Sequence, residues 1–221
     1  MERALSLGGG LATDAMIVGL MHIKSQWVFE LNDKELLELI SMSLGDIGEL
    51  KSQPATDWTG EIPLPDPIGE LYRKVGPYEI SVPTTGNDFY IPALSNLWEL
   101  QAGYRWNSIT QDRLDDWSDD WLVIASRGGD PVIISVNDLS VRYAWHGEGI
   151  WDFKLIVDDP TVFYACVAIL GREFNKFPNR RTLPQDDYEQ LEASLETAVV
   201  KSWSALLGSV YAARKLWEEL G

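Results

Sequence analysis

The expected fold depends on the stretch D-D-W-S-D-D-W-L-V-I-A-S-R-G-G-D-P-V-I-I-S-V, residues Asp115–Val136. It contains two short apolar runs, Trp121–Ala125 and Val132–Ser135, which are rich in the Val and Ile that favour strands. The segment between them, Ser126–Pro131, has two adjacent glycines and a proline, as is typical of a longer hairpin loop. The runs are too short for helices and almost continuously apolar. They therefore predict a hairpin at the centre of a sheet covered on both faces.

Other β-rich segments on either side of this hairpin predict the rest of an antiparallel sheet. The expected strands are Pro77–Val82, a brief edge strand at Tyr104–Trp106, Val141–Trp145 and Trp151–Val157. The segment between the first two contains a loop, Pro83–Asp88. The result is a mostly antiparallel sheet of about four to six strands.

Helix signals flank these strands. Asn32 followed by Glu35 predicts a capped helix that ends near Gly45. The pairs Asp66-Pro67 and Asp159-Pro160 each predict an N-cap followed by the first helical residue. Further helices are expected over Pro92–Gly103 and, from the recurrence of apolar residues every three or four positions, over Asp186–Leu220, either as one helix or as two broken near Gly208.

These elements predict an α+β fold with a long C-terminal helical extension. Residues 1–30 are expected to be a loosely ordered leader, since their apolar stretch is too interrupted for a signal peptide or a bilayer span. Residues 178–221 are expected to pack on the domain formed by residues 31–177, because their apolar face is too wide to stay solvated alone. That face either covers the domain or forms a homodimer.

The chain is strongly acidic. Its 221 residues include 34 Asp and Glu against 18 Lys and Arg, a formal net charge of −16. A field of this sign disfavours nucleic acids and anionic membranes as partners and favours a basic protein. The alternative is that the charge serves only solubility.

Residues that commonly carry chemistry are few. Cys166 is the only cysteine, so an intrachain disulfide is excluded and a reducing, cytoplasmic location is expected. His22 and His146 are the only histidines, which is too few for a zinc site without clustered cysteines. We therefore expect no catalytic residues, no cofactor and no metal site.

One acidic and aromatic cluster remains as a candidate for binding a partner. Interfaces favour aromatic anchors inside a polar rim. The candidate residues are Asp115, Asp116, Trp117, Asp119, Asp120, Trp145 and Trp151. The alternatives for the carboxylates are a solvated loop or cap, binding of a cation, or paired-carboxylate catalysis.

The order of motifs resembles the SUKH superfamily, which includes the fungal Smi/Knr cell-wall regulators and many bacterial immunity proteins. The most specific match is W-L-V-I-A-S-R-G-G-D-P-V-I-I at Trp121–Ile134, and the resemblance covers roughly Leu31–Phe174. Weaker matches are Ile62–Pro65 with Leu71-Tyr72, Tyr90–Leu94 and Gln101–Tyr104. The long helix after Pro184 departs from the minimal family pattern.

The resemblance implies an α+β protein that binds and neutralises a toxin, often a nuclease, without catalysing a reaction. We therefore expect an immunity protein whose partner is a basic toxin domain. The alternatives are a regulatory scaffold of the Smi/Knr type and a carboxylate-dependent hydrolase.

Overall fold

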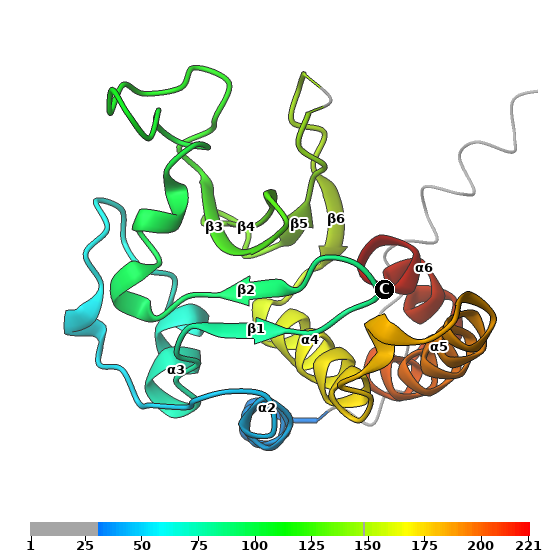
Figure 1. The fold of residues 1–221 in the computed structure, drawn as a ribbon. Coiled ribbons are helices and arrows are strands. Elements are labelled where there is room, and N and C mark those ends of the chain that lie inside the picture. The colour runs from blue at the N-terminus through cyan, green and yellow to red at the C-terminus, as the bar shows by residue number, and fades with distance from the viewer. Residues whose placement is uncertain (1–30, 148) are drawn as a thin grey trace, which may run out of the picture.

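The predicted hairpin lies at the centre of one antiparallel sheet in the computed structural model, which describes residues 31–147 and 149–221 (Figure 1). The six strands follow one another across the sheet in chain order. Their bounds are β1 Ile80–Val82, β2 Phe89–Ile91, β3 Trp121–Arg127, β4 Asp130–Ser135, β5 Val141–Tyr143 and β6 Lys154–Val157. The α+β prediction is confirmed, whereas the leader at residues 1–30 lies outside the described residues.

The central hairpin turns more tightly than predicted. Its strands pair as far as Arg127 and Asp130, so the turn consists of Gly128 and Gly129 alone. Both glycines have positive φ, 61° and 100°, which side chains rarely tolerate and which suits a two-residue turn between twisted strands. The expected longer loop over Ser126–Pro131 was therefore wrong.

Helix α4 Pro160–Asn175 lies against one face of the sheet, and helices α2 Asp33–Gly45 and α3 Asp66–Lys74 pack against α4 (Figure 1). Helix α4 packs on the buried Leu122, Ile124, Val132 and Ile134 in one apolar core. The Tyr164 hydroxyl donates a hydrogen bond of 3.1 Å to the backbone oxygen of Ile124, which ties helix to strand.

Two of the three predicted helix caps are confirmed. The Asn32 side chain accepts from the Glu35 N–H, and the Glu35 carboxylate accepts from the Asn32 N–H. Asp159 caps α4 by accepting from the N–H of Thr161 and Val162. The third prediction was wrong by one position, because the N-cap of α3 is Pro65 and makes no side-chain cap bond.

The C-terminal region forms two helices, α5 Gln185–Leu207 and α6 Val210–Leu220. They separate at Gly208, whose φ is 64°, and the Ser209 hydroxyl caps α6 by accepting from the Ala212 N–H. The indole N–H of the buried Trp203 donates 2.9 Å to the backbone oxygen of Cys166 on α4. The extension therefore packs on the domain. Burial raises the pKa of the Cys166 thiol above its usual range, so Cys166 is an unreactive core residue.

The segment after β2 differs most from expectation. The predicted helix over Pro92–Gly103 was wrong, since the chain makes two 3₁₀ turns, η3 Leu94–Asn96 and η4 Glu99–Gln101. Further 3₁₀ turns are η2 Ala55–Asp57 and η5 Arg180–Thr182. The edge strand predicted at Tyr104–Trp106 was also wrong, because Trp106 forms only isolated bridges with Ala102 and Arg113.

Tertiary hydrogen bonds hold this segment in its observed course. The Leu94 N–H donates to the buried Gln53 side chain at 2.6 Å, which fixes the start of the segment. The buried Gln101 side chain donates to the backbone oxygens of Leu97 and Val123 and accepts from the Val123 N–H. These bonds hold the chain against the open edge of β3, so contacts distant in sequence override the local helix pattern.

The second face of the sheet is covered by aromatic side chains. Val123 and Ile133 are buried there beneath Trp117, with Tyr104, Trp121, Trp151 and Phe153 packed around them. The prediction that the central hairpin is covered on both faces is therefore confirmed. This aromatic layer also supports the loops that form the candidate site.

Candidate functional site

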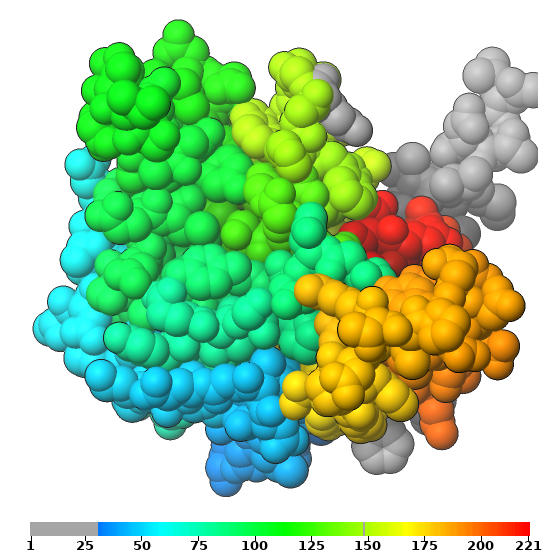
Figure 2. Space-filling model, in the orientation of Figure 1, coloured from blue at the N-terminus to red at the C-terminus, as the bar shows by residue number. Residues whose placement is uncertain are grey.

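Two loops rise from the aromatic face of the sheet, and we call them the first arm and the second arm. The first arm is residues 102–120, and the second is residues 144–147 and 149–153. Figure 2 shows them as separate projections with a notch between their outer parts, on the side of the sheet away from α5 (Figure 1). Their bases touch, because the Trp151 ring lies 5.8 Å from that of Tyr104 and 5.5 Å from that of Trp117.

Trp117 is the centre of this junction. Its ring contacts those of Tyr104, Trp121, Trp151 and Phe153 at centroid separations of 5.4 to 5.7 Å. Only 2% of Trp117 is exposed, so it has no surface to offer a partner. Its predicted role as a partner anchor was wrong, and it acts as the core residue that joins both arms to β3.

Two of the four aspartates of the predicted site, Asp119 and Asp120, form side-chain contacts with other described residues. Asp120 accepts hydrogen bonds from the Ser135 hydroxyl (2.8 Å) and the Asn137 N–H (2.9 Å), so it holds the end of β4 and the turn after it. Asp119 pairs with Arg105 and Arg113. Asp115 and Asp116 are exposed, and neither side chain forms a hydrogen bond or ion pair among residues 31–147 and 149–221.

Exposed apolar side chains complete the arm surface. Ile109 on the first arm is 89% exposed and Ile150 on the second is 74% exposed. The Asn107 side chain accepts from the N–H of Ile109 (2.9 Å) and Thr110 (3.1 Å), which fixes the turn that presents Ile109. The sequence analysis missed both isoleucines, although Ile109 stands alone among polar neighbours, which is the signal that could have identified it.

The remaining predicted anchors differ in accessibility. Trp145 is exposed on one side and rests its ring edge-on against Tyr143 at 5.3 Å. Trp151 is half-buried in the aromatic junction. His146 next to Trp145 is held by Asp130, which accepts from its backbone N–H at 2.8 Å and contacts its ring at 2.5 Å. The second arm is thus anchored to the central hairpin turn.

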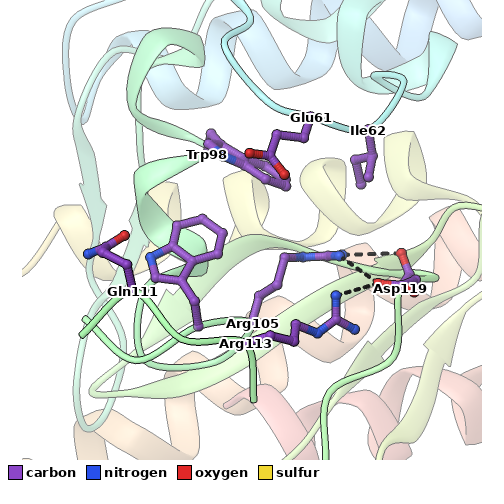
Figure 3. A pocket seen from close by; sticks show the side chains of 8 residues that line it. Glu61, Ile62, Trp98, Arg105, Gln111, Arg113 and Asp119 are labelled. Atoms are coloured by element: carbon purple, nitrogen blue, oxygen red, sulfur yellow. Dashed lines mark hydrogen bonds and ion pairs between the residues drawn. The ribbon is translucent and has the colours of Figure 1, made fainter. Parts of the chain in front are cut away.

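A pocket of about 480 Å³ lies between the first arm and the connector that precedes α3 (Figure 3). Its lining is mixed in charge and contains two indole rings. The lining residues are Glu61, Ile62, Trp98, Arg105, Trp106, Gln111, Arg113 and Asp119. In Figure 3 the guanidinium groups of Arg105 and Arg113 both point toward Asp119.

Arg105 is the buried charge of this pocket, with only 6% of its side chain exposed. Its Nη2 donates to the backbone oxygens of Asp119 (3.2 Å) and Trp121, while its Nη1 lies 3.4 Å from the Asp119 carboxylate. Its buried Nε has no hydrogen-bond partner among residues 31–147 and 149–221. Desolvation, and then the neighbouring Arg113 charge, lower the pKa of Arg105, and Asp119 and Glu61 only partly oppose them.

Asp119 is unsuited to act as a general acid. The hydrogen bond and charge of Arg113 hold the pKa of its carboxyl below the usual range, with a smaller contribution from Arg105. A catalytic carboxylic acid needs the opposite shift. Across residues 31–147 and 149–221, no cluster of His, Cys, Asp and Glu has the makings of a metal site.

No helix in the described part of the chain has the length and apolarity to cross a bilayer. Comparisons of the sequence and the structure with models of known protein families, with curated proteins and with solved structures found no match. The resemblance to the SUKH superfamily therefore stays a prediction.

Proposed function

We propose that the protein is a non-enzymatic binding module that captures a basic protein with its two arms. The observation that carries the proposal is that the first arm exposes both carboxylates, Asp115 and Asp116, and an apolar side chain, Ile109. A buried aromatic junction supports the loops that present them. Protein interfaces combine apolar anchors with a polar rim, and the arms present both kinds of side chain.

The two kinds of side chain have different physical roles in this proposal. Carboxylates on a surface of net charge −16 attract a basic partner over the Debye length and raise the association rate. The apolar groups Ile109, Ile150 and Trp145 lose water only once the complex has formed, so they mainly slow dissociation.

The kind of partner follows from the resemblance noted above. We propose a toxin domain, such as a nuclease, which must be basic to bind nucleic acid and would meet the acidic arms in the cytoplasm. The α+β architecture is the one that the SUKH resemblance implied. A regulatory scaffold would use the same binding surface, whereas the hydrolase alternative finds no support in Asp119, whose pKa is lowered.

The test begins with capture of proteins from the native host by the immobilised full-length chain, followed by affinity measurement with the purified captured protein. We expect a partner with a basic surface, weaker binding by Ile109→Ser and slower association by the double variant Asp115→Asn/Asp116→Asn. Burying one isoleucine contributes about 1.5–3 kcal/mol, so Ile109→Ser should weaken binding by about tenfold or more.

Matched controls separate the arms from the rest of the surface. Asp186 and Asp187 form an exposed acidic pair in the first turn of α5, away from the arms (Figure 1). The variant Asp186→Asn/Asp187→Asn removes the same charge. A captured partner whose affinity ignores Ile109→Ser and responds equally to both acidic pairs would refute binding through the arms.

A further inference from the structure

The pocket beside the first arm has more cationic donors than its own acceptors satisfy. Two arginines, Arg105 and Arg113, converge on the single carboxylate of Asp119. Arg105 is nearly buried, its Nε is unpartnered, and its Nη1 makes only a long contact of 3.4 Å. A buried charged donor with only a long contact is poorly satisfied, so a better-placed acceptor at Nη1 would stabilise this guanidinium.

The Asp119 carboxylate can be replaced. Its side chain is 83% exposed, and ion pairs at such positions contribute little because water screens them. Arg105 does not depend on it for position, since Nη2 is held by the backbone oxygens of Asp119 and Trp121 and the guanidinium lies 5.5 Å from the centre of the Trp98 ring. The cationic site therefore persists when the Asp119 side chain turns to solvent.

The rest of the pocket suits an apolar body. The rings of Trp98 and Trp106 lie 5.2 Å apart at a tilt of 46°, and Ile62 joins them in the lining. Small-molecule sites combine such an apolar wall with a few fixed polar groups, in volumes of roughly 300–1,000 Å³. The pocket, at about 480 Å³, lies in this range.

We infer that this pocket binds a small organic monocarboxylate, whose apolar body lies against Trp98 and Trp106 and whose carboxylate takes the place of Asp119 on Arg105 and Arg113. The exposed Glu61 in the lining disfavours a second negative charge on the ligand. In Figure 3, Glu61 and Trp98 lie on one side of the pocket and the two arginines lie on the other. This inference is independent of the proposed protein partner.

The probes for the test are benzoate, 3-phenylpropionate and indole-3-propionate, with 3-phenylpropanol as the uncharged control. Binding to the full-length protein is measured by isothermal titration and by saturation-transfer NMR. We expect saturable binding of at least one carboxylate in the millimolar range or tighter, as befits a ligand of this size, and none of the alcohol.

Two substitutions give opposite results if the inference is right. Arg113→Gln removes one of the two cations and should weaken carboxylate binding by about tenfold or more, the scale of one charge-assisted pair. Asp119→Asn removes the internal competitor and should strengthen binding. A purely structural ion pair offers no reason for the second result.

Arg73→Gln is the matched control, because it breaks a comparable exposed ion pair with Glu70 on α3, outside this pocket. It should leave carboxylate binding unchanged, and a thermal melt of each variant verifies that it is folded. The inference is overturned if neither the wild type nor Asp119→Asn shows saturable binding of any carboxylate probe up to its solubility limit. Binding that Arg113→Gln does not weaken overturns it equally.

Discussion

The side chain of Gln101 completes the hydrogen bonding of the central strand, and replacing it should cost much of the stability of the fold. Strand β2 pairs with β3 only at Ser126 and Arg127, so the same edge of β3 lacks a strand partner at Val123. There the Gln101 carboxamide accepts from the Val123 N–H and donates to the Val123 oxygen, both at 2.9 Å. A side chain thus takes the place of a neighbouring strand.

The variant Gln101→Met keeps the length and approximate volume of the side chain but removes these bonds. Two buried backbone groups of Val123 then lack partners, and each unsatisfied group costs about 1–3 kcal/mol. Part of this cost is offset because the polar amide of Gln101 no longer has to be buried. We expect the free energy of unfolding to fall by about 2–5 kcal/mol, a large fraction of the roughly 5–15 kcal/mol typical of a folded protein.

Urea unfolding followed by tryptophan fluorescence measures this loss, and hydrogen exchange locates it. The Val123 amide should exchange much faster in Gln101→Met than in the wild type, relative to amides on α5. The control Gln185→Met alters an exposed glutamine and should change stability by no more than about 0.5 kcal/mol. A loss below about 1 kcal/mol for Gln101→Met, or unchanged exchange at Val123, would refute the assigned role of Gln101.

Three further predictions concern stability. Ile134→Ala should lower the free energy of unfolding by about 2–4 kcal/mol in urea melts, since it truncates a fully buried side chain. Asp138 has its pKa lowered to about 2 by hydrogen bonds from Ser140, so its stabilising effect is complete above its unfolded value of about 4 and is lost as the pH falls toward 2. Acid titration should therefore show a shallower loss of stability over that range in Asp138→Asn than in the wild type. Trp203→Phe removes the bond to the Cys166 oxygen and should lower the melting temperature, and an unchanged melt would count against the contact between α5 and α4.

The parts of the fold that the sequence predicted depend on local patterns. The hairpin at Trp121–Ser135 followed from apolar runs around two glycines, and α2 and α4 followed from the caps at Asn32 and Asp159. The break at Gly208 was one of two predicted alternatives for the C-terminal helices. In each of these cases the signal lies within a few residues of the feature that it specifies.

The failures have a common physical cause. The segment Pro92–Gly103 has a helical pattern, but Gln53 and Gln101 form buried bonds with partners 41 and 22 residues away, and no local pattern records them. The same holds for Trp117, whose burial depends on the second arm folding back so that Trp151 and Phe153 cover it. The different surroundings of the four aspartates likewise depend on Arg105, Arg113 and the end of β4.

Capture of a basic protein by the acidic arms is tested most directly by the association rate constant of the purified pair, measured against ionic strength. The wild type is compared with Asp115→Asn/Asp116→Asn and with the control Asp186→Asn/Asp187→Asn. Asp119 and Asp120 are left intact because their carboxylates already have partners within the chain, Arg113 for Asp119 and Ser135 for Asp120.

We predict that association slows markedly as salt shortens the Debye length from about 10 Å at 0.1 M to about 3 Å at 1 M. At low salt the Asp115/Asp116 variant should associate several-fold more slowly than the wild type and depend less on salt, while the Asp186/Asp187 variant stays close to the wild type. If the rate constant ignores both salt and the arm substitutions, the acidic surface serves only solubility and the partner binds elsewhere.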